Sequence, residues 1–138
     1  MTSGGGVRAL DIASGDPVWT VATEAGMMPS PVIDTMRRAV IAVGGDGVVY
    51  EIELRTGAIR RTLGLQSADA MSSPRITSDG RIYLGTAETV WSIDSGLKIA
   101  NWTYRPTGVR GIGDIPLALS RDLVLTTGTR PYGFIHSF

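Results

Sequence analysis

The sequence predicts an all-β protein: a β-propeller with four-stranded antiparallel blades of about 42 residues, of which about three are present. Three observations predict this fold. Sequence markers recur with one period, short β-rich runs alternate with glycine-bearing turns, and no segment has the apolar spacing of an amphipathic helix. Four strands in each period, with no helix among them, exclude leucine-rich and helical repeats.

Two markers define the period most clearly. An apolar position at the start of a β-rich run returns at spacings of 42, 41 and 45 residues, and a proline ahead of another run returns at spacings of 43 and 42 residues. The equivalent residues are Val7, Val49, Val90 and Ile135 for the first marker, and Pro31, Pro74 and Pro116 for the second.

These markers divide the chain into a leader, expected to be flexible, and four blade segments. The predicted segments are the leader at 1–6, an outer half-blade at 7–22, a blade at 29–63, a blade at 71–104 and an incomplete blade at 115–138. A closed ring needs about four to eight blades. The remaining blades or a second copy are therefore needed to close it, and both arrangements stay open. Because Phe138 falls inside a strand motif, we favour a piece of a larger ring.

The second blade shows how the strands are expected to follow one another. Asp46-Gly47 lies between two β-rich runs, and Asp-Gly is a strong hairpin signal because glycine adopts positive φ without steric cost. In the next run Tyr50 and Ile52 point to one face and the acidic residues to the other. The expected strands are 30–33, 39–43, 48–54 and 58–63, with a turn at 36–38.

Composition excludes several classes of function. Thirteen basic and thirteen acidic residues balance, so the chain has no long-range field to attract nucleic acid or an anionic membrane, and we expect neither as a partner. Without cysteine there is no disulfide, thiolate metal site or cysteine nucleophile. No apolar run approaches the roughly 20 residues of a membrane span, and no signal peptide is visible.

The segment from Ala9 to Trp19 carries a family resemblance. It reads A-x-D-x-x-x-G-x-x-x-W, with Asp11 and Gly15 at the inner positions, and resembles the tryptophan-docking motif of PQQ-like (quinoprotein-type) β-propeller repeats. The resemblance implies that the tryptophan packs on a peptide plane of the next blade. The second copy has Arg61 where tryptophan is expected, which puts docking in doubt there. The Gly-His and Trp-Asp pairs of WD40 repeats are absent.

The resemblance also implies the function classes to consider. The first is a non-enzymatic scaffold that binds a protein or small-molecule ligand at a propeller face, similar to assembly and sensor proteins built from PQQ-like repeats. The alternative is a fragment of a PQQ-dependent dehydrogenase whose catalytic residues lie outside this chain. PQQ and calcium are expected as cofactors only under that alternative. The family resemblance suggests a periplasmic or extracytoplasmic location.

No residue set in the sequence forms a catalytic, cofactor or metal site. His136 is a lone histidine in a strand-like run, without an orienting partner. We expect Arg105, Arg110 and Asp114 near the central channel, where a ligand would bind, because their segment leads to an innermost strand. Two further sets of residues are expected to have structural roles. Acidic residues at turns should cap backbone groups, and the basic pairs at 37–38 and 60–61 should be solvated edges.

Overall fold

The computed structural model describes residues 5–23, 26, 29–66, 72–98, 100–105, 107, 117–128 and 134–137, with the backbone alone for 126–128 and 134–137. These residues form thirteen strands and no helix. The prediction of an all-β fold with four-stranded antiparallel sheets is confirmed.

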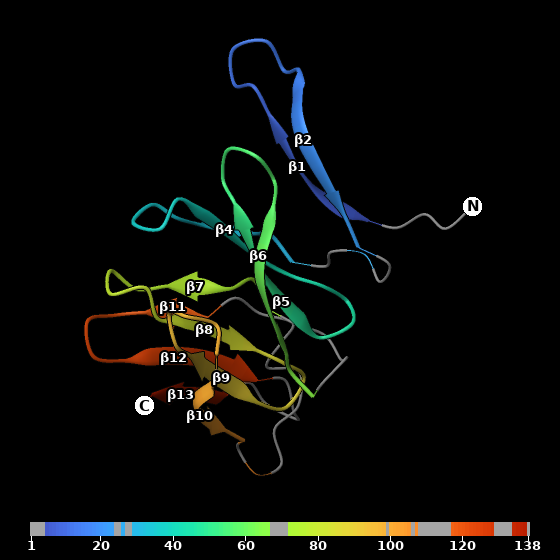
Figure 1. Ribbon diagram of the computed structural model, residues 1–138. Coiled ribbons are helices and arrows are strands. Elements are labelled where there is room, and N and C mark those ends of the chain that lie inside the picture. Colours follow the sequence, from blue (N-terminus) through green and yellow to red (C-terminus); the bar gives the residue numbers. More distant parts are fainter. Residues whose placement is uncertain are drawn as a thin grey trace.

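The strands form four separate sheets that follow one another along the chain (Figure 1). The half-blade consists of β1 (Gly6–Leu10) and β2 (Pro17–Ala22). The second blade consists of β3 (Val32–Asp34), β4 (Ala39–Val43), β5 (Val48–Glu53) and β6 (Ile59–Gly64). The third blade consists of β7 (Arg75–Ile76), β8 (Ile82–Gly85), β9 (Val90–Ile93) and β10 (Ala100–Tyr104). The fourth blade consists of β11 (Ala118–Leu119), β12 (Val124–Gly128) and β13 (Phe134–Ser137).

Every described pair of neighbouring strands is antiparallel, and the sheets keep the strand order of the sequence. The β4–β5 connection is tight because Gly47 takes a φ of 81°, which a residue with a side chain rarely adopts. The innermost strand of the second blade begins at Val32, later than predicted. The backbone N–H of Ser30 binds the side chain of Ser73 in the third blade, so it joins two blades and does not extend β3.

The hydrophobic core lies between the sheets, in three clusters that each join two consecutive blades. Side chains on β5 divide between two of them: Tyr50 and Ile52 pack toward the half-blade, and Val49 packs toward the third blade. Alternation along the strand therefore gives the second blade two apolar faces, each covered by a neighbouring blade. A third cluster, around Tyr83 and Val90, joins the third blade to the fourth.

Candidate functional site

The indole ring of Trp19 joins the half-blade to the second blade. Its Nε1–H donates a 2.9 Å hydrogen bond to the backbone carbonyl of Leu54, in the turn after β5. Gly57 in the same turn lies beneath the ring: a Cβ on this glycine would come within 2.8–2.9 Å of three indole carbons. Glycine at this position thus allows the ring to lie directly on the backbone, as the tryptophan-docking resemblance implies.

The turn between β1 and β2 is held by Asp11. Its Oδ1 accepts hydrogen bonds of 2.9 Å from the backbone N–H groups of Ala13 and Ser14, and its backbone carbonyl accepts one from Gly15. Gly15 has a φ of 78°, the left-handed conformation that closes the turn. The aspartate and glycine of the motif therefore shape the hairpin that brings Trp19 toward the next blade.

Arg61 occupies the position of Trp19 at the next junction. Its Nη1 donates a 3.0 Å hydrogen bond to the backbone carbonyl of Gly96 in the third blade. A Cβ on Gly96 would be 3.6 Å from the same Nη1, so the guanidinium group lies against this glycine. Arg61 is half exposed, as predicted for a solvated edge, and it also contacts the next blade, which the sequence did not predict. A planar guanidinium group can replace an indole here because both groups pack against a backbone and donate an N–H to a carbonyl.

The docking residue is paired across the hairpin with the residue at the first position of the motif. Ala9 lies opposite Trp19, whereas Glu51 lies opposite Arg61. In the third blade Ser92 lies opposite Trp102. A small residue thus accompanies each tryptophan, and a carboxylate accompanies the arginine.

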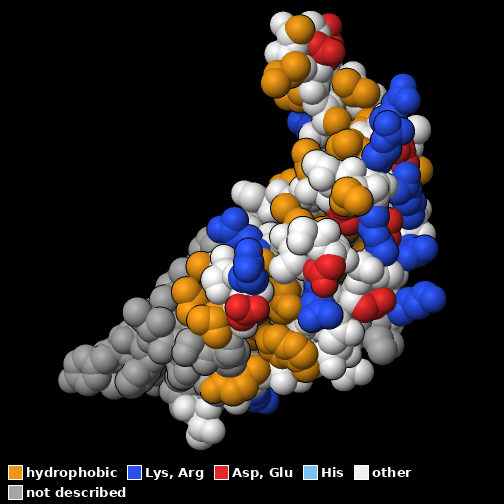
Figure 2. All heavy atoms as spheres, turned by 90° about the vertical axis from the view of Figure 1, so that its left-hand side faces the viewer, with side chains coloured by type: hydrophobic (Ala, Val, Ile, Leu, Met, Phe, Trp, Pro, Cys, Tyr) orange, Lys and Arg blue, Asp and Glu red, His pale blue; other side chains and the backbone are white. Residues whose placement is uncertain are grey.

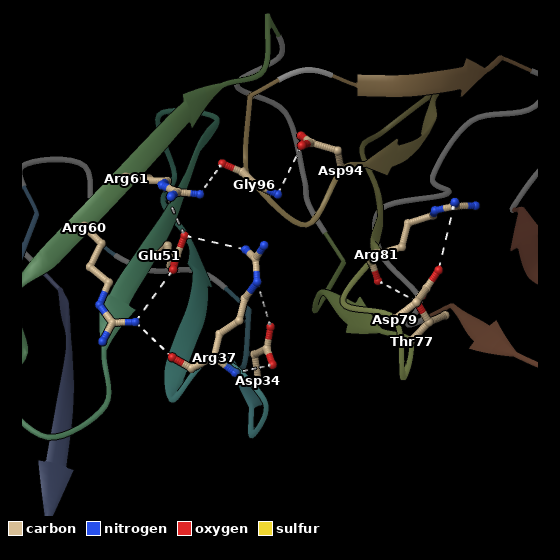
Figure 3. A network of polar contacts seen from close by, with 10 residues as sticks. All are labelled: Asp34, Arg37, Glu51, Arg60, Arg61, Thr77, Asp79, Arg81, Asp94 and Gly96. Atoms are coloured by element: carbon tan, nitrogen blue, oxygen red, sulfur yellow. Dashed lines mark hydrogen bonds and ion pairs between the residues drawn. The ribbon is translucent and has the colours of Figure 1, made fainter.

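Glu51 is the centre of a polar network at this second junction (Figure 3). Its side chain is 5% exposed, and three guanidinium groups approach it: those of Arg37 and Arg61 at 4.0 Å and that of Arg60 at 3.8 Å. Asp34, also buried, lies 3.9 Å from Arg37. Burying a carboxylate is costly without opposite charge nearby, and the three arginines supply that charge.

The third repeat keeps the acidic turn cap but changes the glycine position. Asp94 accepts hydrogen bonds from the backbone N–H groups of Gly96 and Lys98. The positive φ, 52°, falls on Leu97, the residue after Gly96. Leu97 is nevertheless buried in the core cluster between the second and third blades, so its side chain is held there by packing.

The carboxylates that cap turns are stabilised in their charged form. Backbone hydrogen bonds from Ser14 and Ala13 lower the pKa of Asp11. A hydrogen bond from the Thr56 side chain is the main cause that lowers the pKa of Glu53. Both groups therefore remain ionised at neutral pH and serve as hydrogen-bond acceptors for the turns.

The residues predicted to face the channel are only partly described. Arg105 is exposed and forms an ion pair with Glu88, in the loop that leads to β9. Arg110 and Asp114 lie outside the described residues. The expectation that these three residues lie together near the channel therefore stays a prediction.

The described residues do not contain a set of ligands for calcium. Within this part of the chain, no three His, Cys, Asp or Glu side chains are placed to hold a metal ion. Asp11, Glu53 and Asp94 lie in separate turns, and each accepts hydrogen bonds from backbone N–H groups. These carboxylates do not converge on one point, so they do not fit the calcium that accompanies PQQ.

Comparison with known proteins gives matches at the level of structure. No protein-family model matches the sequence, and no curated protein matches it significantly. BamB from Moraxella catarrhalis is 22% identical, with 97% of this chain and 39% of that chain covered and a TM-score of 0.75. The computationally designed Ika8 protein is 15% identical over 97% of this chain and 40% of its own, with a TM-score of 0.77. The chain folds as part of a β-propeller.

A second designed protein gives the same result over a larger share of its length. Ika4 is 17% identical, with 97% of this chain and 79% of that chain covered and a TM-score of 0.74. The propeller segment described here spans about two fifths of BamB and of Ika8. Identities this low establish the fold alone. The likeness to BamB is consistent with the PQQ-like propeller repeat that the sequence resembles.

Among the described residues, no helix is long and apolar enough to cross a membrane. Sequence reasoning identified Arg61 as a departure from the motif and missed Glu51 as its partner. The two residues lie opposite one another across the hairpin, so the change at one position accompanies the change at the other.

Proposed function

We propose that this chain is a segment of a non-enzymatic β-propeller that acts as a scaffold for a protein partner. The observation that supports this function best is the use of its charged side chains. Arg61, which pairs with Glu51, joins two blades, and Asp11, Glu53 and Asp94 cap turns. These groups are engaged in building a rigid frame, and a rigid frame with exposed turns suits recognition of another protein.

The PQQ-dependent dehydrogenase fragment leads to a different expectation. Such a protein would bind PQQ together with calcium and pass electrons from an alcohol or aldehyde to a dye. The scaffold would bind a protein partner saturably and would not reduce the dye. Because the alternative places the catalytic residues outside this chain, the test measures PQQ binding by the chain as well as dye reduction.

The experiment has two arms. In the first, partners captured by chemical cross-linking in an extract of the source cells are identified, purified and titrated against the chain by calorimetry. In the second, the chain is mixed with PQQ and calcium and PQQ binding is measured by calorimetry; an alcohol or aldehyde substrate and an electron-accepting dye are then added, and dye reduction is followed. Saturable binding of a purified protein, with neither PQQ binding nor dye reduction, supports the scaffold. PQQ binding, PQQ-dependent dye reduction, or failure of every purified candidate to bind would refute it.

A further inference from the structure

Five arginine side chains gather at one end of the second blade, in the β3–β4 turn, the β5–β6 turn and the start of β6. Hydrogen bonds bring these segments together, because the Arg60 guanidinium group donates to the backbone carbonyl of Arg37 and the backbone N–H of Leu54 donates to that of Arg38. Figure 2 shows Lys and Arg side chains along one edge of the molecule, on the right in that view. The arginine surface, as we call it, consists of Arg37, Arg38, Arg55, Arg60 and Arg61.

On the arginine surface, the positive groups are more exposed to solvent than the negative groups. The carboxylates beneath it are largely buried: the side chain of Glu51 is 5% exposed and that of Glu53 is 17% exposed. The guanidinium groups above them reach solvent, with Arg60 37% and Arg61 50% exposed. A partner arriving from solvent therefore meets positive charge first, although the chain as a whole is neutral.

Much of the hydrogen-bonding capacity of the arginine surface is unused. Each guanidinium group has five N–H donors in a planar fork that matches a carboxylate. Arg38 and Arg55 are exposed, and within the described residues neither takes part in an ion pair. These two arginines can each bind an incoming carboxylate without disturbing the network around Glu51.

Apolar side chains stand beside the arginines. Met36 precedes Arg37 in the β3–β4 turn and is 84% exposed, and Ile59 precedes Arg60 at the start of β6 and is 47% exposed. Methionine and arginine are both enriched at protein interfaces relative to the rest of the surface. Exposed apolar groups give nothing to a nucleic-acid backbone, whereas they pack against apolar residues of a peptide.

We infer that the arginine surface binds an acidic segment of a protein partner in which glutamate or aspartate alternates with apolar residues. The carboxylates of that segment pair with Arg38 and Arg55, and its apolar residues cover Met36 and Ile59. The inference rests on the proposed scaffold function and names the chemistry of the partner.

The test is a titration of the full chain with a fluorescein-labelled peptide of alternating glutamate and leucine, followed by fluorescence anisotropy. Two comparison probes are a peptide with glutamine in place of glutamate and a single-stranded DNA oligonucleotide. We expect saturable binding of the acidic peptide, weaker binding at higher salt and no binding of the glutamine peptide. Absence of binding by the acidic peptide would overturn the inference.

The decisive variant is the double substitution Arg38→Asn and Arg55→Ala. Asparagine is chosen because residue 38 has a φ of 53°, which asparagine tolerates better than alanine. We expect it to weaken the acidic peptide about tenfold or more, since charged hydrogen bonds to two arginines are lost. Arg55→Ala alone, which leaves the strained turn intact, should give a part of this loss. Arg121→Ala, an exposed arginine in the fourth blade, is the matched control and should change nothing.

The Met36→Ser variant distinguishes binding of an acidic peptide from binding of nucleic acid. It should weaken the glutamate–leucine peptide several-fold if leucine packs on the methionine. Oligonucleotide binding that exceeds peptide binding and is unchanged in Met36→Ser would overturn the inference in favour of nucleic acid. A purified partner that binds the wild type and the Arg38/Arg55 variant equally well would also overturn it, while leaving the scaffold function standing.

Discussion

Arg61 stands where Trp19 stands one repeat earlier, and each donates a side-chain N–H to a backbone carbonyl 35 residues further along the chain. One junction is therefore closed by an aromatic ring and the next by a guanidinium group with the same geometry. The aromatic junction is apolar, with Val7 and Val21 in its core. The arginine junction carries a buried carboxylate, Glu51. The two junctions should respond differently to mutation and to salt.

Trp19→Ala should be more destabilising than Trp91→Ala. The first removes a ring packed on Gly57 and leaves the Leu54 carbonyl without its indole donor, so we expect a loss of about 3–4 kcal/mol in the free energy of unfolding. The Nε1 of Trp91 has no hydrogen-bond partner in the described part of the chain. Urea denaturation of the two variants measures the difference, and an equal or smaller loss at Trp19 would contradict its docking role.

Gly57→Ala should be more destabilising than Gly15→Ala. Both glycines have positive φ, 74° and 78°, so the backbone penalty of about 1 kcal/mol is shared. Only at Gly57 would the new Cβ collide with Trp19, whereas nothing lies within 4 Å of a Cβ at Gly15. We therefore expect a further loss of about 1–3 kcal/mol and a change in tryptophan fluorescence only for Gly57→Ala. Identical stability and spectra would show that the ring does not rest on this glycine.

The sequence predicts the propeller, its repeats and the first docking motif because these depend on local patterns. Alternation along β5 and Asp46-Gly47 determine strand faces and a hairpin within a few residues. The second junction depends on a cross-strand pair, and neither Glu51 nor Arg61 indicates docking when considered alone. Its geometry became visible only when the register placed the two residues opposite one another.

The third repeat shows a second limit to what the sequence alone predicts. Glycine is the usual residue at positive φ, yet Leu97, directly after Gly96, takes that conformation. Burial explains the difference: Leu97 is 4% exposed in the core between blades. Packing of a leucine side chain contributes about 2–3 kcal/mol, which exceeds the cost of about 1–2 kcal/mol for a left-handed residue.

This balance gives a prediction for Leu97 and Arg38, the two residues with side chains at positive φ in the described part of the chain. Leu97→Gly should lower the free energy of unfolding by about 2 kcal/mol or more, because lost packing outweighs relief of the backbone. Arg38→Gly should raise it by about 0.5–1 kcal/mol, because the exposed Arg38 side chain loses no packing. Urea denaturation checks both, and a gain in stability from Leu97→Gly would contradict the packing argument.

Acid should weaken the hairpins through their capping carboxylates. Hydrogen bonds hold the pKa of Asp11 and of Glu53 below their ordinary values of 3.8 and 4.5 in the folded chain. Their contribution is thus complete above the unfolded pKa values and is lost as the pH falls through the folded ones. Unfolding midpoints measured from neutral pH to about pH 3 should fall most steeply below about pH 4.5. Asp11→Asn should make that fall shallower. Asp16→Asn, whose carboxylate accepts no hydrogen bond from the described residues, is the control and should leave it unchanged.

The arginine junction should be convertible into the aromatic one. Glu51→Ala alone removes the carboxylate that Arg37, Arg60 and Arg61 share, and should lower the free energy of unfolding by about 2–3 kcal/mol. Arg61→Ala alone removes the hydrogen bond to Gly96 and should lower it by about 1–2 kcal/mol.

The double substitution Glu51→Ala and Arg61→Trp places alanine opposite tryptophan in the second blade. This is the pair that Ala9 and Trp19 form in the half-blade. We expect the double variant to be within about 1 kcal/mol of the wild type, because an apolar pair can replace a buried ion pair without loss. Its unfolding midpoint should also depend less on salt than that of the wild type, since a charged pair has been removed. A loss equal to the sum for Glu51→Ala and Arg61→Ala would show that the two positions act independently, contrary to the coupled junction described above.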